Sequence, residues 1–104
     1  MSQIHNLDAG KFEEQITHAK GKVVLDIWGS GCAPCVVVGN ILVDLAEELP
    51  ELTIFKMNFA DGPEIAVELG VMGLPSLFLF EDGELKKQHA GAITKADLRA
   101  WITA

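Results

Sequence analysis

Positive charge, cysteine and long apolar runs are all scarce in this sequence of 104 residues. Eight basic residues stand against fifteen acidic ones, which gives a formal charge of −7. Nucleic acids and anionic membrane surfaces select basic patches, so we expect neither as a partner. No apolar run approaches the ~18 residues of a membrane span. Residues 1–6 also lack the basic and apolar regions of a signal peptide. We therefore expect a cytoplasmic, monomeric, globular protein with one domain over residues 1–104.

The only two cysteines, Cys32 and Cys35, come soon after an apolar run at residues 22–28. A disulfide between them would close a loop too short to remove much chain entropy, so it would be a poor structural link. A reducing cytosol also argues against a permanent disulfide. If a helix begins at Ala33-Pro34, Cys32 lies at its N-terminus, where free N–H groups favour a thiolate. The pattern indicates a redox-active dithiol, with Cys32 as the attacking thiol and Cys35 as the resolving thiol.

The hydrophobic pattern predicts alternating helices and strands, followed by a hairpin and a last helix. Expected helices cover residues 8–19, 34–49, 64–69 and the segment after Thr94, and expected strands cover residues 22–28, 52–58, 76–80 and 84–90. Gly39 predicts a kink in the second helix. Asp82-Gly83 suits a two-residue hairpin turn. This order predicts an α/β protein with a mixed sheet and helices on both faces.

Asp26 stands between Leu25 and Ile27 in the expected buried strand. Burial penalises the charged carboxylate and so raises its pKa, towards a range useful for proton transfer. A structural role is the alternative, in which Asp26 marks a strand edge or pairs with Lys56. The pattern alone does not separate the two.

Taken together, these residues resemble the thioredoxin family from about Phe12 to the C-terminus. The residues that carry the resemblance are Asp26, Trp28, Cys32-Ala33-Pro34-Cys35, Lys56, Gly70, Gly73-Leu74-Pro75-Ser76, Asp82-Gly83 and Gly91. The cysteine pair alone is a moderate signal. The signal becomes strong because Asp26, Pro75 and Gly91 stand at the family's positions relative to the cysteine pair.

The resemblance implies a thioredoxin fold, with a mixed sheet of about five strands, about four helices and an additional first strand near residues 3–7. The residues that it assigns to catalysis are Cys32, Cys35, Asp26 and Lys56, with Asp26 as the proton acceptor. It implies a cis peptide bond before Pro75, which would pack against the dithiol. The backbone at Leu74 would pair with an extended target peptide. The other residues that it places at the substrate-binding surface are Trp28, Gly31, Ala33, Pro34 and Gly91.

The sequence departs from the family beside the cysteines. Thioredoxins usually carry Trp-Cys-Gly-Pro-Cys-Lys, whereas this chain has the run Gly31-Cys32-Ala33-Pro34-Cys35-Val36. Asn40 replaces the helix-kinking proline of the family. Loss of the lysine charge at position 36 should weaken the stabilisation of the thiolate modestly. It should also make the protein surface around the cysteines more apolar. The hypothesis is that partner choice has narrowed or changed while the exchange chemistry remains, and neutral drift is the alternative.

The sequence thus predicts a thiol–disulfide oxidoreductase that reduces protein disulfides. Its expected partners are disulfide-containing target proteins and an electron donor of the thioredoxin-reductase type, and we expect no metal and no organic cofactor. One alternative is a more oxidising dithiol that forms or isomerises disulfides. Another is a non-enzymatic module that binds a partner, or that shares an iron–sulfur cluster between two chains. The Ala33-Pro34 dipeptide does not separate reductant from oxidant, because potentials in this fold span roughly −270 to −120 mV.

Overall fold

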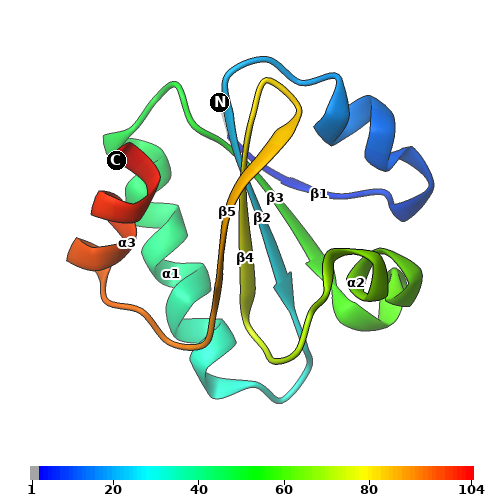
Figure 1. The fold of residues 1–104 in the computed structure, drawn as a ribbon. Coiled ribbons are helices and arrows are strands. Elements are labelled where there is room, and N and C mark those ends of the chain that lie inside the picture. Colours follow the sequence, from blue (N-terminus) through cyan, green and yellow to red (C-terminus); the bar gives the residue numbers. More distant parts are fainter. Residues whose placement is uncertain (1–2) are drawn as a thin grey trace.

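A five-stranded mixed sheet forms the centre of the protein, with strand order β1-β3-β2-β4-β5 (Figure 1). The computed structural model describes residues 3–104. The strands are β1 (Ile4–Asn6), β2 (Lys22–Trp28), β3 (Thr53–Asn58), β4 (Ser76–Glu81) and β5 (Glu84–Ala90). Strand β3 runs parallel to both β1 and β2, whereas β4 is antiparallel to β2 and to β5. The expected mixed sheet is confirmed, including the short first strand that the family resemblance implied.

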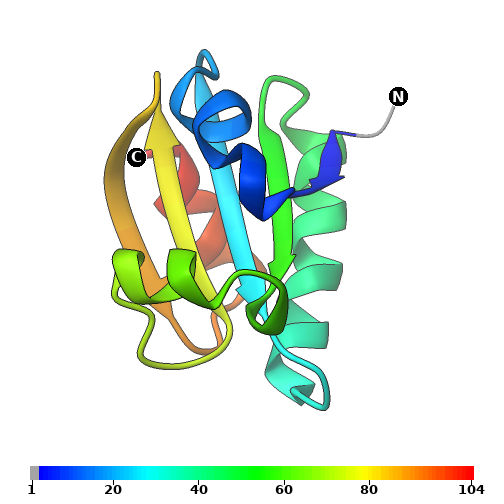
Figure 2. The ribbon, with the colours of Figure 1, turned by 90° about the vertical axis from the view of Figure 1, so that its right-hand side faces the viewer.

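Helices cover both faces of this sheet (Figures 1 and 2). The α-helices are α1 (Ala33–Glu48), α2 (Pro63–Leu69) and α3 (Lys95–Thr103), and a short 3₁₀ turn, η3, covers Phe59–Asp61. Helices α1 and α3 lie on one face, while α2 and the N-terminal helical turns lie on the other. Helix α1 is one continuous α-helix through Gly39. The kink expected at that residue stays a prediction. None of the helices within residues 3–104 is long and apolar enough to cross a membrane.

The expected helix over residues 8–19 is wrong in its type and extent. The segment forms a 3₁₀ turn, η1 (Ala9–Lys11), followed by a wide π-helical turn, η2 (Glu13–Thr17). Asp8 caps the first turn by accepting a hydrogen bond from the Gly10 N–H at 2.9 Å. The His18 N–H donates to the Glu13 carbonyl, five residues back, at 3.0 Å. Such a bond belongs to a π-helix, and the glycine near the start lowers α-helical propensity.

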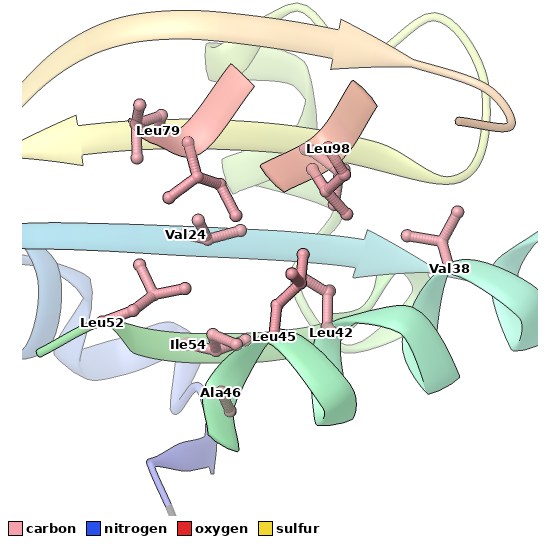
Figure 3. Packing of buried hydrophobic residues seen from close by; sticks show 11 residues of the cluster. Val24, Val38, Leu42, Leu45, Ala46, Leu52, Ile54, Leu79 and Leu98 are labelled. Carbon is pink, nitrogen blue, oxygen red and sulfur yellow. The ribbon is translucent and has the colours of Figure 1, made fainter. Parts of the chain in front are cut away.

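Strand β2 is buried on both faces, because a hydrophobic cluster packs against each of them. Side chains alternate along a strand, so Val24 points to one face and Leu25 to the other. Val24 joins the cluster under α1 and α3, with Leu42, Leu45 and Leu98 (Figure 3). Leu25 joins the second cluster, under α2 and the N-terminal turns. By the same alternation, Asp26 lies on the α1 face.

The ends of the last helices follow the signals in the sequence. Gly70 adopts a left-handed conformation with φ 75° and ends α2, a conformation that glycine reaches without steric cost. Thr94 caps α3, where its hydroxyl oxygen accepts a hydrogen bond from the Asp97 N–H at 3.1 Å. The carboxyl end of β2 and the start of α1 meet at the lower edge of the sheet in Figure 1, where the cysteines lie.

Candidate active site

Cys32 and Cys35 form a disulfide at the start of α1, with their Cα atoms 5.2 Å apart. Cys32 is the N-cap residue and has an extended backbone, while Cys35 lies in the first turn and donates its N–H to the Cys32 sulfur at 3.2 Å. Cys32 is partly exposed, whereas Cys35 is only 5% exposed. An external sulfur therefore reaches Cys32 more readily. On reduction, the helix N-terminus and the Cys35 N–H both favour a thiolate on Cys32.

Asp26 is fully buried within β2, two residues before the strand ends at Trp28, and neither carboxylate oxygen has a hydrogen-bond partner among residues 3–104. Desolvation raises the pKa of Asp26 from 3.8 to about 6, against the lowering effect of the nearby Lys56 ammonium. Asp26 lies inside the central strand rather than at a strand edge. Nor does it form a direct ion pair with Lys56 among the described residues. Burial thus gives the carboxyl a pKa at which it can exchange protons near neutral pH.

Lys56 lies beside Asp26 on the neighbouring strand, since the two residues are register partners between β2 and β3. Its ammonium nitrogen is 5.9 Å from the centre of the Trp28 ring. The same nitrogen approaches α1 so closely that a Cβ added at Gly39 would lie 3.3 Å from it. Lys56 therefore sits between the sheet and α1. Among the described residues, no hydrogen-bond acceptor and no carboxylate contacts its ammonium.

The segment before β4 has the cis peptide bond that the resemblance implied, between Leu74 and Pro75. The Leu74 side chain lies against the loop after β2, because a Cβ added at Gly29 would be 2.7 Å from Leu74 Cδ1. The Pro75 carbonyl accepts a hydrogen bond from the Gly91 N–H at 2.8 Å, which ties the segment to the end of β5. Three of the predicted site residues, Leu74, Pro75 and Gly91, are therefore linked at the start of β4.

A pocket of about 560 Å³ includes both cysteines in its lining. Its lining combines the loop after β2, one side of α1 and Lys56: Trp28, Gly29, Ser30, Gly31, Cys32, Ala33, Cys35, Val36, Gly39, Asn40, Val43 and Lys56. Of the predicted substrate-binding residues, Trp28, Gly31 and Ala33 lie here. The others, Pro34, Leu74, Pro75 and Gly91, do not. Asp26 is not part of the lining.

The sequence reasoning missed Val43 as a residue of this site. The signal was present, because Val43 follows Val36 by seven residues and Asn40 by three, the spacing of one helical face. The spacing alone could place Val43 on this face of the helix. It could not show that Lys56 packs against the same face. No cluster of three or more metal-ligating side chains occurs among residues 3–104.

A closely spaced cysteine pair at the start of a helix, together with a buried acid whose pKa is raised, is typical of a thiol–disulfide oxidoreductase. The comparisons with known proteins agree. The thioredoxin family model matches residues 3–104. The chain is 31% identical to a thioredoxin of Pseudomonas aeruginosa over 102 residues, which cover 97% of this chain and 94% of the relative. It is 34% identical to a thioredoxin of Rhodospirillum rubrum over 94 residues, which cover 89% of this chain and 90% of the relative. This chain belongs to the thioredoxin family.

Proposed function

We propose that this thioredoxin-family protein reduces disulfides in target proteins, with Cys32 as the attacking thiol and Cys35 as the resolving thiol. The observation that carries the proposal is the unequal access to the two sulfurs. Cys32 caps α1 and is partly exposed, whereas Cys35 is 5% exposed one turn inside the helix. An incoming disulfide can therefore meet Cys32 first, while Cys35 stays close enough to act second.

The reaction proceeds in two exchanges. The Cys32 thiolate attacks one sulfur of the target disulfide, and the other target sulfur leaves as a thiolate. The Cys35 thiolate then attacks Cys32, forms the Cys32–Cys35 disulfide and releases the second target sulfur. Cys35 must lose its proton before this step. Asp26, with its pKa raised to about 6, is the group that we assign to accept that proton, through water, with Lys56 balancing its charge.

Membership of the thioredoxin family implies disulfide-containing target proteins and a reductase partner in general. We propose that an extended target strand pairs with the backbone at Leu74, beside the cis peptide bond, and lies over Pro75 and Gly91. The residues that would complete this surface are Trp28, Gly31, Ala33 and Pro34. The monomeric state, the single domain and the cytoplasmic location stay predictions from the sequence.

Catalytic turnover on a protein disulfide tests this proposal. We expect small amounts of the protein to accelerate the reduction of insulin disulfides by dithiothreitol, with the released chains followed by turbidity. The variant Thr103→Ala, at the end of α3, should retain full activity. An uncatalysed rate with properly folded protein would contradict the proposed function.

The exposed apolar side chain at position 36 gives a second prediction. Val36 is 64% exposed beside the disulfide, so Val36→Lys should fold normally and place a cation near the Cys32 thiolate. We expect this variant to reduce generic protein disulfides about twofold to fivefold faster, because the charge lowers the pKa of the thiol. Val37→Lys is the matched control, since Val37 is 56% exposed on the same helix but outside the pocket. Equal rates for both variants on every substrate would favour neutral drift at position 36.

A further inference from the structure

The departures from the thioredoxin pattern beside the cysteines are gathered in one pocket. Each of them lines the 560 Å³ cavity that includes both cysteines, which we call the α1 pocket: Gly31, Ala33, Val36 and Asn40. The residues that match the family on the β4 side of the site lie outside this lining: Leu74, Pro75 and Gly91. The α1 pocket is therefore the part of the site in which this chain differs from the family pattern, and a difference in partner choice is expected to depend on it.

One wall of the α1 pocket is an exposed apolar face of α1. Val36 and Val43 are 64% and 47% exposed, and both line the pocket together with Gly39 and Asn40. These four residues share one helical face, because they follow the i, i+3, i+4, i+7 spacing. This face offers apolar contact to a partner that extends along the helix from the disulfide.

Lys56 gives the α1 pocket its charge. The ammonium nitrogen is 5.9 Å from the centre of the Trp28 ring and lies beside Gly39, where an added Cβ would be 3.3 Å away. No residue in the described part of the chain forms an ion pair with it, and the buried Asp26 carboxylate is the opposite charge that acts on it through the fold. In a chain with a formal charge of −7, this is a local positive point in apolar surroundings. It is complementary to an acidic side chain with apolar neighbours.

The helix sets the distance between the attacking sulfur and this positive point. The Lys56 ammonium lies at the level of Gly39, which is seven residues beyond Cys32. At ~1.5 Å of rise per residue, this separation is about 10 Å along the helix axis. An extended target segment advances ~3.3 Å per residue. A target whose cysteine meets Cys32, and whose chain continues along α1, therefore brings a residue about three positions away to Lys56.

We propose that the α1 pocket is a specificity site for target proteins that carry an acidic side chain about three residues from the cysteine that Cys32 attacks. The carboxylate pairs with Lys56, and the apolar residues of the same target segment pack on Val36 and Val43. Lys56 thereby determines which targets are reduced fastest. The inference rests on the proposed function, because it concerns the same reaction, and it adds the chemistry of the preferred target.

The first exchange can be observed by itself in the Cys35→Ser variant, which serves as the background for every measurement. The substrates are peptides blocked at both ends, whose single cysteine forms a disulfide with the uncharged leaving group pyridine-2-thiol. The Cys32 thiolate attacks the peptide sulfur and forms a mixed disulfide with the peptide. The pyridine thiolate leaves and takes up a proton, and its absorbance gives the rate. No second exchange and no proton transfer to Asp26 enters this rate.

The test compares glutamate with glutamine at one position of the peptide. One pair of peptides carries this residue three positions before the cysteine and a second pair three positions after it, because a target segment can run along α1 in either direction. At low peptide concentration we expect the glutamate peptide of one pair to react about fivefold faster than its glutamine twin. Lys56→Met should bring this ratio to one. Lys20→Met is the matched control, since it removes the same charge at an exposed position before β2, at the other end of that strand from the cysteines.

Changes in the charge around Lys56 should move the ratio in both directions. Asp26→Asn should raise it about twofold, because it removes the negative charge that offsets Lys56. Val43→Glu should abolish it and make a lysine peptide the faster substrate, because it places a carboxylate in the pocket. Val67→Glu is the matched control, since Val67 is 79% exposed on α2, across the sheet. An effect of Lys56 on thiol reactivity does not alter these ratios, because it is common to both peptides of a pair.

The outcomes separate this inference from the proposed function. Equal rates for glutamate and glutamine in both pairs would overturn the specificity site, and so would a glutamate preference that survives Lys56→Met. Insulin reduction by the unmodified protein would in either case leave the proposed function standing. Loss of insulin reduction would refute the proposed function itself.

Discussion

Replacing Cys32 with serine is expected to abolish the reduction of protein disulfides, a loss on the order of 10³-fold or more. A serine hydroxyl at the α1 N-terminus is not ionised at neutral pH, and Cys35 is 5% exposed, so no competent nucleophile faces the target. Cys35→Ser should behave differently. It should complete the first exchange and then stop, because nothing releases the mixed disulfide on Cys32.

Mass spectrometry separates these two outcomes. Cys35→Ser, incubated with a disulfide target, should accumulate a covalent adduct on Cys32, and Cys32→Ser should not. The variant Thr103→Ala, remote from the site on α3, should turn over like the unmodified protein and accumulate no adduct. An adduct on Cys35 of the Cys32→Ser variant, with none on Cys32 of the Cys35→Ser variant, would show that the assigned roles of the two cysteines are wrong.

Replacing Asp26 with asparagine is expected to change stability in a pH-dependent way. Desolvation raises the pKa of Asp26 to about 6 in the folded protein, although Lys56 lowers it, against an ordinary value of 3.8. Below pH 3.8 the carboxyl is protonated in both states and its ionisation costs nothing. Between the two values the unfolded state prefers to ionise, so stability is lost as the pH rises to about 6. At pH values above both of these pKa values, the loss of stability reaches about 3 kcal/mol.

Asp26→Asn is therefore expected to raise the free energy of unfolding. The pH-dependent part of this increase approaches about 3 kcal/mol at pH 8 and falls below about 1 kcal/mol at pH 4. Urea unfolding at the two pH values measures it. Asp61→Asn removes the same charge at an exposed position in η3 and serves as the matched control. A gain that is the same at both pH values would mean that Asp26 does not titrate with a raised pKa. The same variant should also slow the second exchange, because Cys35 loses its proton acceptor.

Much of the fold could be read from the sequence, because local signals and tertiary packing agree. The apolar run at residues 22–28 is a central strand buried on both faces, and Thr94 caps the last helix as its position suggested. The three-residue strand Ile4–Asn6 was placed only through the resemblance to thioredoxins, since it is too short to show a period. The segment at residues 8–19 was misread, because its helical spacing of apolar residues does not distinguish an α-helix from a 3₁₀ turn followed by a π-helical turn.

The parts of the site that lie within one segment of the chain could be predicted from the sequence. The parts formed by the packing of two segments could not. Cys32 at the helix start and Asp26 inside a strand are local patterns. The approach of Lys56 to Gly39 joins β3 to α1 and depends on how these elements pack, so neither residue alone indicates it. The pocket beside the disulfide, including Val43, follows from that packing.

The midpoint potential of the Cys32–Cys35 couple tests the central claim most directly. Equilibration of the protein in thiol buffers, followed by tryptophan fluorescence, gives the value, because Trp28 shares the pocket lining with both cysteines. Trp28→Phe identifies the part of the signal that comes from the site rather than from Trp101. A reductant of protein disulfides should have a potential near −270 mV. A value above about −200 mV would contradict that role and indicate a protein that forms or isomerises disulfides.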